Sequence, residues 1–176
     1  MRGFSLVEMI VVVAITAFLS ALLLTYNRSS DNQIVLSVER EKVMGFLNRA
    51  KAFALERNLA KGGEDVCAFG VNFNKGNGTM EIFRIGSGVS GGCGDSDPSL
   101  DGTNNSVIEG LTLASRVEFR SFTCTPTTPC DAASHDVAFI PPYLKTVNSG
   151  SIVLGVKGSS NVLTVEVGVG GEITPR

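Results

Sequence analysis

The sequence contains no tryptophan and only one histidine, His135. It has no P-loop of the GxxxxGK[ST] type, so a common nucleotide-binding signature is missing. The formal net charge of −2 excludes the strongly basic field typical of nucleic-acid-binding proteins. None of the four cysteines stands in a CxxC pair, so the ligand spacing typical of a zinc site is missing, and we expect no zinc site. Its 176 residues suit one domain with an appendage.

What the sequence does have is one long apolar run, Phe4–Leu24, close to its N-terminus. As a helix this run spans about 31 Å, which matches the hydrocarbon core of a bilayer. Arg2 precedes the run and favours a cytoplasmic N-terminus. An ordinary secretory signal is the alternative, but Glu8 lies inside the run and costs on the order of 2.5–3.5 kcal/mol at the centre of a membrane helix. Such a carboxylate usually has a partner.

The segment Gly3–Ile10, GFSLVEMI, resembles the class III signal of type IV prepilins and type II secretion pseudopilins. The resemblance implies that prepilin peptidase cuts after Gly3 and that Phe4 becomes the N-methylated terminus. It also implies that Glu8 is the assembly carboxylate. The expected partners are other subunits, the peptidase and an inner-membrane assembly platform. The expected location is the bacterial inner membrane, single-pass, with a periplasmic C-terminal domain that enters a filament.

The chain therefore divides into a leader (1–3), a membrane and assembly helix (4–24), an amphipathic continuation (25–61) and a periplasmic globular β-domain (62–176). Whether the helix breaks in the polar stretch 25–32 stays open. Downstream, six apolar residues fall within about 120° of a helical wheel and predict a face that packs on a sheet. These residues are Val43, Phe46, Leu47, Ala50, Phe53 and Ala54.

After Gly63 the pattern turns strand-like, with glycine-rich hairpin turns at 74–78 and 158–160. No helical pattern separates the strands, so we predict an α+β fold in which the long N-terminal helix packs on one mainly antiparallel sheet. The predicted strands are Val66–Phe73, Thr79–Ile85, Arg116–Cys124, Asp136–Ile140, Ser151–Lys157 and Asn161–Val167.

Arg49–Arg57, Phe139–Pro142 and a C-terminal hairpin that closes in Gly170–Ile173 resemble the GspH/FimT-like minor subunits. The resemblance implies a minor pseudopilin or minor pilin at or near a filament tip. Some FimT-like pilins resemble DNA receptors with arginines near the C-terminal tail, which makes DNA uptake the alternative. This tail carries only Arg176, whereas a duplex binder needs several phosphate contacts, so nucleic acid is not the expected partner. A signal-anchored periplasmic enzyme is the third hypothesis.

Outside the cytoplasm, two disulfides are the natural state of Cys67, Cys93, Cys124 and Cys130. Four cysteines allow three connectivities, and the sequence leaves them open. Cys124 and Cys130 enclose a loop of five residues that is easily closed, and that pairing would leave Cys67 to bond Cys93. His135 stands between Ser134 and Asp136, but adjacent side chains in a strand point to opposite faces, so we expect no catalytic residue here.

The loop 86–106 contains Asp95, Asp97 and Asp101, with Glu109 beyond, and these oxygens could hold calcium. The EF-hand pattern is not met, and Asp is also an ordinary turn former. An exposed loop without a cofactor is therefore the expectation, with calcium as the alternative.

Overall fold

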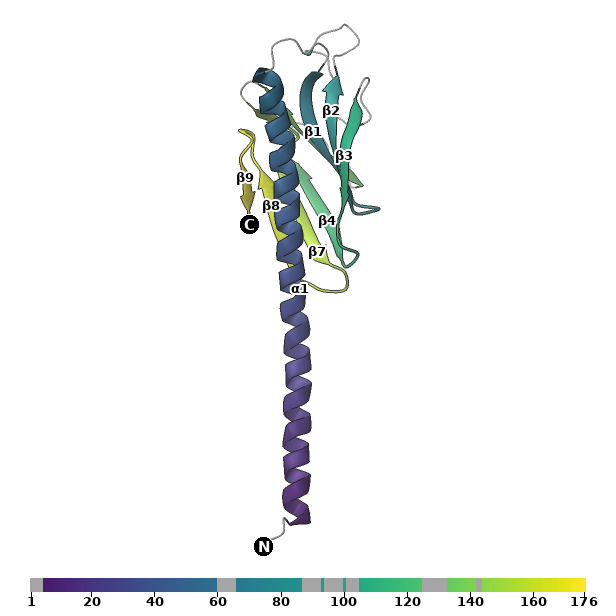
Figure 1. Cartoon of the computed structure of the whole chain (residues 1–176), viewed down its shortest axis with the longest axis vertical. Coiled ribbons are helices and arrows are strands. Elements are labelled where there is room, and N and C mark those ends of the chain that lie inside the picture. The colour runs from purple at the N-terminus through teal and green to yellow at the C-terminus, as the bar shows by residue number, and fades with distance from the viewer. Residues whose placement is uncertain are drawn as a thin grey trace. The chain divides into compact units, whose positions relative to one another are not determined.

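The computed structural model describes residues 5–59, 66–86, 93, 100, 105–124, 133–141 and 144–176. The chain divides into two compact units, Met1–Val35 and Leu36–Arg176. The helix α1 (Leu6–Leu59) contributes residues to both units, and the second unit contains all the strands (Figure 1). The fold class is α+β, as predicted.

The polar stretch 25–32 is helical throughout, so the open question of a break is answered in favour of one α-helix. This stretch contains no proline, and no backbone N–H is lost from the helical ladder. In the second unit the predicted face of α1 is buried: Val43, Leu47, Ala50 and Ala54 are fully enclosed. Phe53 is half-buried, and its ring lies 5.8 Å from that of Phe69 on the sheet.

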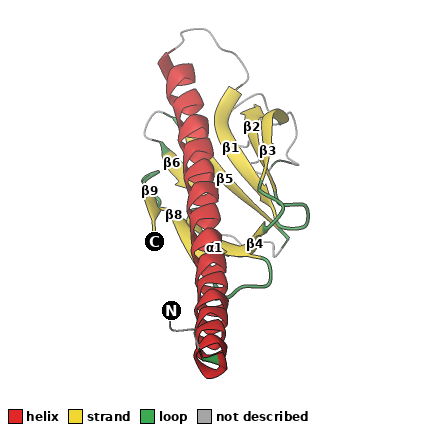
Figure 2. Ribbon diagram, turned by 60° about the horizontal axis from the view of Figure 1, so that its bottom comes forward, coloured by secondary structure: helices red, strands yellow, loops and turns green. Residues whose placement is uncertain are grey.

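The strand pairs are antiparallel, as predicted, but the strands divide between two sheets instead of lying in one. One sheet has the order β3-β2-β1-β5-β6 and the other β4-β7-β8-β9 (Figure 2). The strands are β1 (Val66–Asn74), β2 (Thr79–Gly86), β3 (Ser106–Thr112), β4 (Val117–Cys124), β5 (Ser134–Ile140), β6 (Lys145–Val147), β7 (Gly150–Val156), β8 (Val162–Val167) and β9 (Ile173–Pro175).

The two predicted hairpins are present, and glycine makes both turns possible. Gly78 follows β1 and Gly158 follows β7, each with positive φ, a conformation that other residues adopt at a cost. The strands β3, β6 and β9 were not predicted as strands. β3 lies at the end of the Gly- and Asp-rich loop, where turn-forming residues hide the start of a strand pattern. The other two are three residues long, too short for a periodic signal.

Phenylalanines are the largest fully buried side chains of the second unit. Phe73, Phe83, Phe119 and Phe139 are all fully buried, and the rings of Phe73 and Phe119 meet edge to face at 5.6 Å. This contact joins β1 of one sheet to β4 of the other, so aromatic packing holds the two sheets together.

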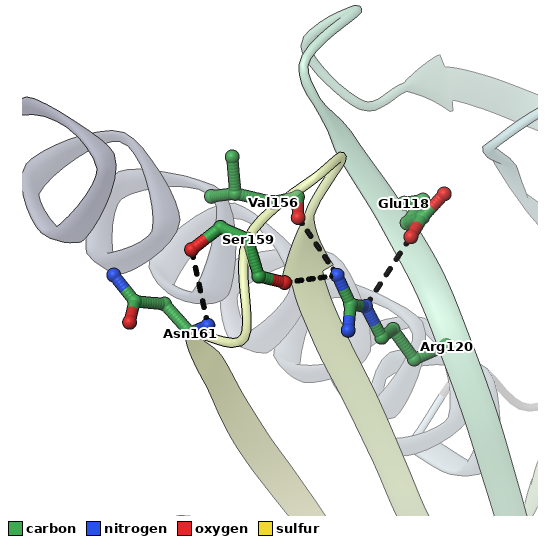
Figure 3. Close-up of polar contacts among 5 residues, drawn as sticks. All are labelled: Glu118, Arg120, Val156, Ser159 and Asn161. Atoms are coloured by element: carbon green, nitrogen blue, oxygen red, sulfur yellow. Dashed lines mark hydrogen bonds and ion pairs between the residues drawn. The ribbon is translucent and has the colours of Figure 1, made fainter. Parts of the chain in front are cut away.

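A β-bulge in β4 places Arg120 where it holds the β7–β8 hairpin (Figure 3). Its Nη2 donates hydrogen bonds to the carbonyl oxygens of Val156 and Ser159, at 2.8 and 2.5 Å. Its Nε lies 3.2 Å from the carboxylate of Glu118. A Cβ built on Gly155 would come within 2.3 Å of Arg120 Nε, so only glycine leaves room for this guanidinium.

Candidate functional site

The N-terminal part of α1 is an apolar helix, and its side chains from Leu6 to Leu23 are all exposed. Over Leu6–Leu23 the mean hydropathy is 2.6 and none of the window is buried. Phe18 and Leu23 expose 65% and 70% of their surfaces. Exposure of this much apolar surface to water is energetically unfavourable. By length and composition, this helix can cross a membrane.

The polar side chains within this apolar helix are satisfied by its own backbone. The Thr16 hydroxyl donates to the carbonyl oxygens of Val12 and Val13, and the Ser20 hydroxyl donates to that of Thr16. A hydroxyl that bonds the preceding turn needs no water, so these residues are compatible with a lipid environment.

Glu8 is the one acidic residue in this apolar helix, and it lies in the first turn. The Ser5 carbonyl accepts the backbone N–H groups of Glu8 and Met9, at 3.0 and 3.2 Å. A carboxylate in a first turn interacts favourably with the positive end of the helix dipole. Its side chain is exposed, and Glu8 has no ion-pair partner within the described residues. The cleavage-site residues Gly3 and Phe4 lie outside them.

His135 and Asp136 point to opposite faces of β5, as predicted. His135 is buried against Phe122, with ring centroids 5.5 Å apart, and its Nδ1 lies 3.3 Å from Cys124 Sγ. Burial lowers the pKa of His135 to about 4. Asp136 instead accepts hydrogen bonds from the Asn72 side chain, at 2.7 Å, and from the Leu100 backbone N–H, at 3.2 Å.

The cysteines are structural. Cys67 and Cys93 form a disulfide with Cα atoms 5.3 Å apart, which is one of the three connectivities that the sequence left open. Cys124 is also disulfide-bonded, and Cys130, its predicted partner, lies outside the described residues. The Cys67–Cys93 bond links β1 to residue 93, beyond β2, and so restricts the unfolded chain.

The calcium candidates Asp95, Asp97 and Asp101 lie outside the described residues. Glu109 is engaged elsewhere, because its carboxylate pairs with Arg49 Nη1 at 2.9 Å. Within the part of the chain that the structure describes, no three His, Cys, Asp or Glu side chains gather as metal ligands do. The calcium hypothesis therefore gains no support from Glu109.

The side chain of the C-terminal arginine, Arg176, also forms an ion pair. Arg176 Nε lies 2.7 Å from Glu166, and the Arg176 backbone pairs with Thr164 at the edge of the second sheet. The tail therefore presents a neutral ion pair rather than an isolated cation. The sequence analysis missed the pair Arg49–Glu109 and the hydrogen bonds from Arg120 to Val156 and Ser159, because each joins elements distant in sequence.

Residues 1–24 match the family model of the prokaryotic N-terminal methylation motif. No curated protein matches the chain, and no solved structure does. The matched segment carries a prepilin-like class III signal, which defines the class of this N-terminus. The motif indicates a type IV pilin-like prepilin, a substrate for processing, and it points to a structural subunit rather than an enzyme. One N-terminal helix followed by antiparallel sheets agrees with the pilin-like layout expected from the resemblance.

Proposed function

We propose that this protein is a minor pseudopilin or minor pilin, a GspH/FimT-like structural subunit of a type II secretion pseudopilus or a type IV pilus. The observation that carries the proposal is the methylation motif over residues 1–24 on a helix whose apolar surface is exposed. Prepilin peptidase removes residues 1–3, and the remaining chain enters the filament at or near its tip. The partners are other subunits, the peptidase and the inner-membrane assembly platform.

The role of Glu8 follows from the cost of charge in lipid. Cleavage after Gly3 frees an α-amine at Phe4, and both this amine and the Glu8 carboxylate are costly in a bilayer. A charge-assisted pair between the amine of one subunit and the Glu8 of its neighbour offsets much of that cost. Without cleavage the amine is absent from Phe4, so processing gates assembly.

Mass spectrometry of the mature N-terminus from the native host tests the proposal. We expect a chain that starts at Phe4 and carries one N-methyl group. An N-terminus generated near Ala21 would restore the ordinary secretory signal and overturn the proposed class.

The substitution Glu8→Gln tests the assembly step, because it removes the charge and keeps the size. We expect normal membrane insertion and processing but loss of the variant from sheared filaments. Val7→Leu is the matched control, since it changes the neighbouring side chain and leaves the helix apolar. Equal amounts of wild type and Glu8→Gln in sheared filaments would contradict the pairing mechanism.

A further inference from the structure

Three chain reversals of the second unit gather at one end, which we call the turn end. It comprises the β1–β2 turn (75–78), the β3–β4 connection (113–116) and the β7–β8 turn (157–161). The Leu113 N–H donates to the Gly78 carbonyl at 2.9 Å, and the Lys157 N–H donates to the Arg116 carbonyl at 2.9 Å. Backbone hydrogen bonds therefore join the three reversals into one continuous surface.

Chain direction places the turn end beside the start of this unit's helix. α1 ends at Leu59 and β1 begins at Val66, so the short connection returns β1 alongside the helix in the opposite direction. Phe53 contacts Phe69, and the six residues from Phe69 to Lys75 advance about 20 Å. This advance reaches the helical turns just after Leu36, where the unit begins. Figure 1 shows the lower ends of β4 and β7 beside α1.

The turn end contains a hollow of about 270 Å³ with a positive lining. Its charged lining residues are Lys75, Lys157 and Glu118. Glu118 is paired with Arg120 at 3.2 Å, whereas Lys75 and Lys157 are exposed and make no ion pair within the described residues. Backbone groups of Gly76 and Gly78 also line the hollow. Lys75 and Lys157 both line this hollow, and ammonium groups are donors that suit a phosphate, although the whole chain is acidic.

The length of the connection between the two units indicates which partner the turn end can meet. Residues 24–35 join the apolar window Leu6–Leu23 to the second unit, and even when extended they reach only about 40 Å. A bilayer that holds the window therefore keeps headgroups within reach of the second unit. We propose that the turn end binds the headgroups of anionic phospholipids, with Lys75 and Lys157 at their phosphates. The inference rests on the membrane anchoring in the proposed function.

Each lysine close to an anionic surface strengthens binding about fivefold, and screening by salt removes the effect. The contact holds the globular unit against the membrane before assembly and releases it without a conformational change. A subunit drawn into a filament gives up only these two charge contacts.

The test uses the full chain reconstituted into vesicles of phosphatidylcholine alone or with phosphatidylglycerol. A membrane-impermeant amine-acylating reagent labels exposed lysines, and mass spectrometry gives the rate at each one. Lys145 is the internal control, because it is exposed on β6 opposite Ile140, at the other end of β5 from the turn end. Normalisation to Lys145 within the same molecules removes differences in vesicle orientation.

We expect labelling of Lys75 and Lys157, relative to Lys145, to fall about fivefold in the anionic vesicles and to recover in high salt. In Lys157→Gln, we expect the protection of Lys75 to weaken. Equal ratios in the two lipids, protection that survives high salt, or equal protection of Lys145 would each overturn the proposal. A chain that fails to float with either vesicle would instead refute the membrane anchor itself.

Discussion

The buried imidazole of His135 makes the stability of the globular unit depend on pH in a calculable way. Its pKa is about 4 in the folded protein against 6.5 for the free side chain, because burial beside Phe122 and the Cys124 sulfur disfavours the charged imidazolium. Between about pH 4 and pH 6.5, the unfolded chain therefore binds a proton at His135 that the folded chain does not bind. The stabilising contribution is complete above about pH 6.5 and is lost as the pH falls toward 4.

The magnitude follows from these two pKa values. At 1.36 kcal/mol per pH unit, acidification from about pH 7 to about pH 4.5 lowers the free energy of unfolding by about 2.4 kcal/mol through His135 alone. This is a substantial part of the 5–15 kcal/mol typical of a folded domain. The chain has no other histidine, so no other imidazole contributes.

The assay is urea unfolding of the full chain in detergent, followed by circular dichroism at the two pH values. His135→Phe keeps a ring for Phe122 to stack on and removes the proton, and His135→Leu removes the ring as well. We expect both variants to lose about 2.4 kcal/mol less than wild type over this interval, since the carboxylates titrate alike in all three.

The same residue offers a direct check by NMR, because the single histidine gives one pair of imidazole resonances. We expect its midpoint near pH 4 in the folded chain. A midpoint above pH 6, or the same pH slope in wild type and both variants, would refute the reasoning from burial.

Three further substitutions test the packing. A Cβ on Gly70 would lie 2.5 Å from the Phe83 ring, so Gly70→Ala should cost about 1–3 kcal/mol in urea unfolding, and a neutral result would contradict the fit. Gly45→Ala should have the opposite effect, because a Cβ on Gly45 would meet no atom within 4 Å. It should raise the free energy of unfolding by about 0.5–1 kcal/mol, since Ala has a higher helix propensity than Gly. Replacement of Cys67 and Cys93 together by Ser should remove about 2–4 kcal/mol, and unchanged stability would show that the bond restrains little.

The sequence by itself determined the features that depend on neighbours along the chain. The apolar window Leu6–Leu23, the buried face of α1 around Leu47 and the hairpin glycines Gly78 and Gly158 were all predicted at their places. Membrane-span length, helical periodicity and left-handed turn geometry are local properties, so a few residues suffice to specify them. The methylation motif belongs to the same kind of local signal.

Only the tertiary structure decided how the strands divide between two sheets and which polar groups meet. Which strands share a sheet depends on pairing between distant segments, and the alternation within each strand is the same for one sheet or two. The bulge that places Arg120 over Gly155 and the pairing of Arg49 with Glu109 have no local signature. The low pKa of His135 likewise needs Phe122 from another strand, because burial is a property of the packed chain.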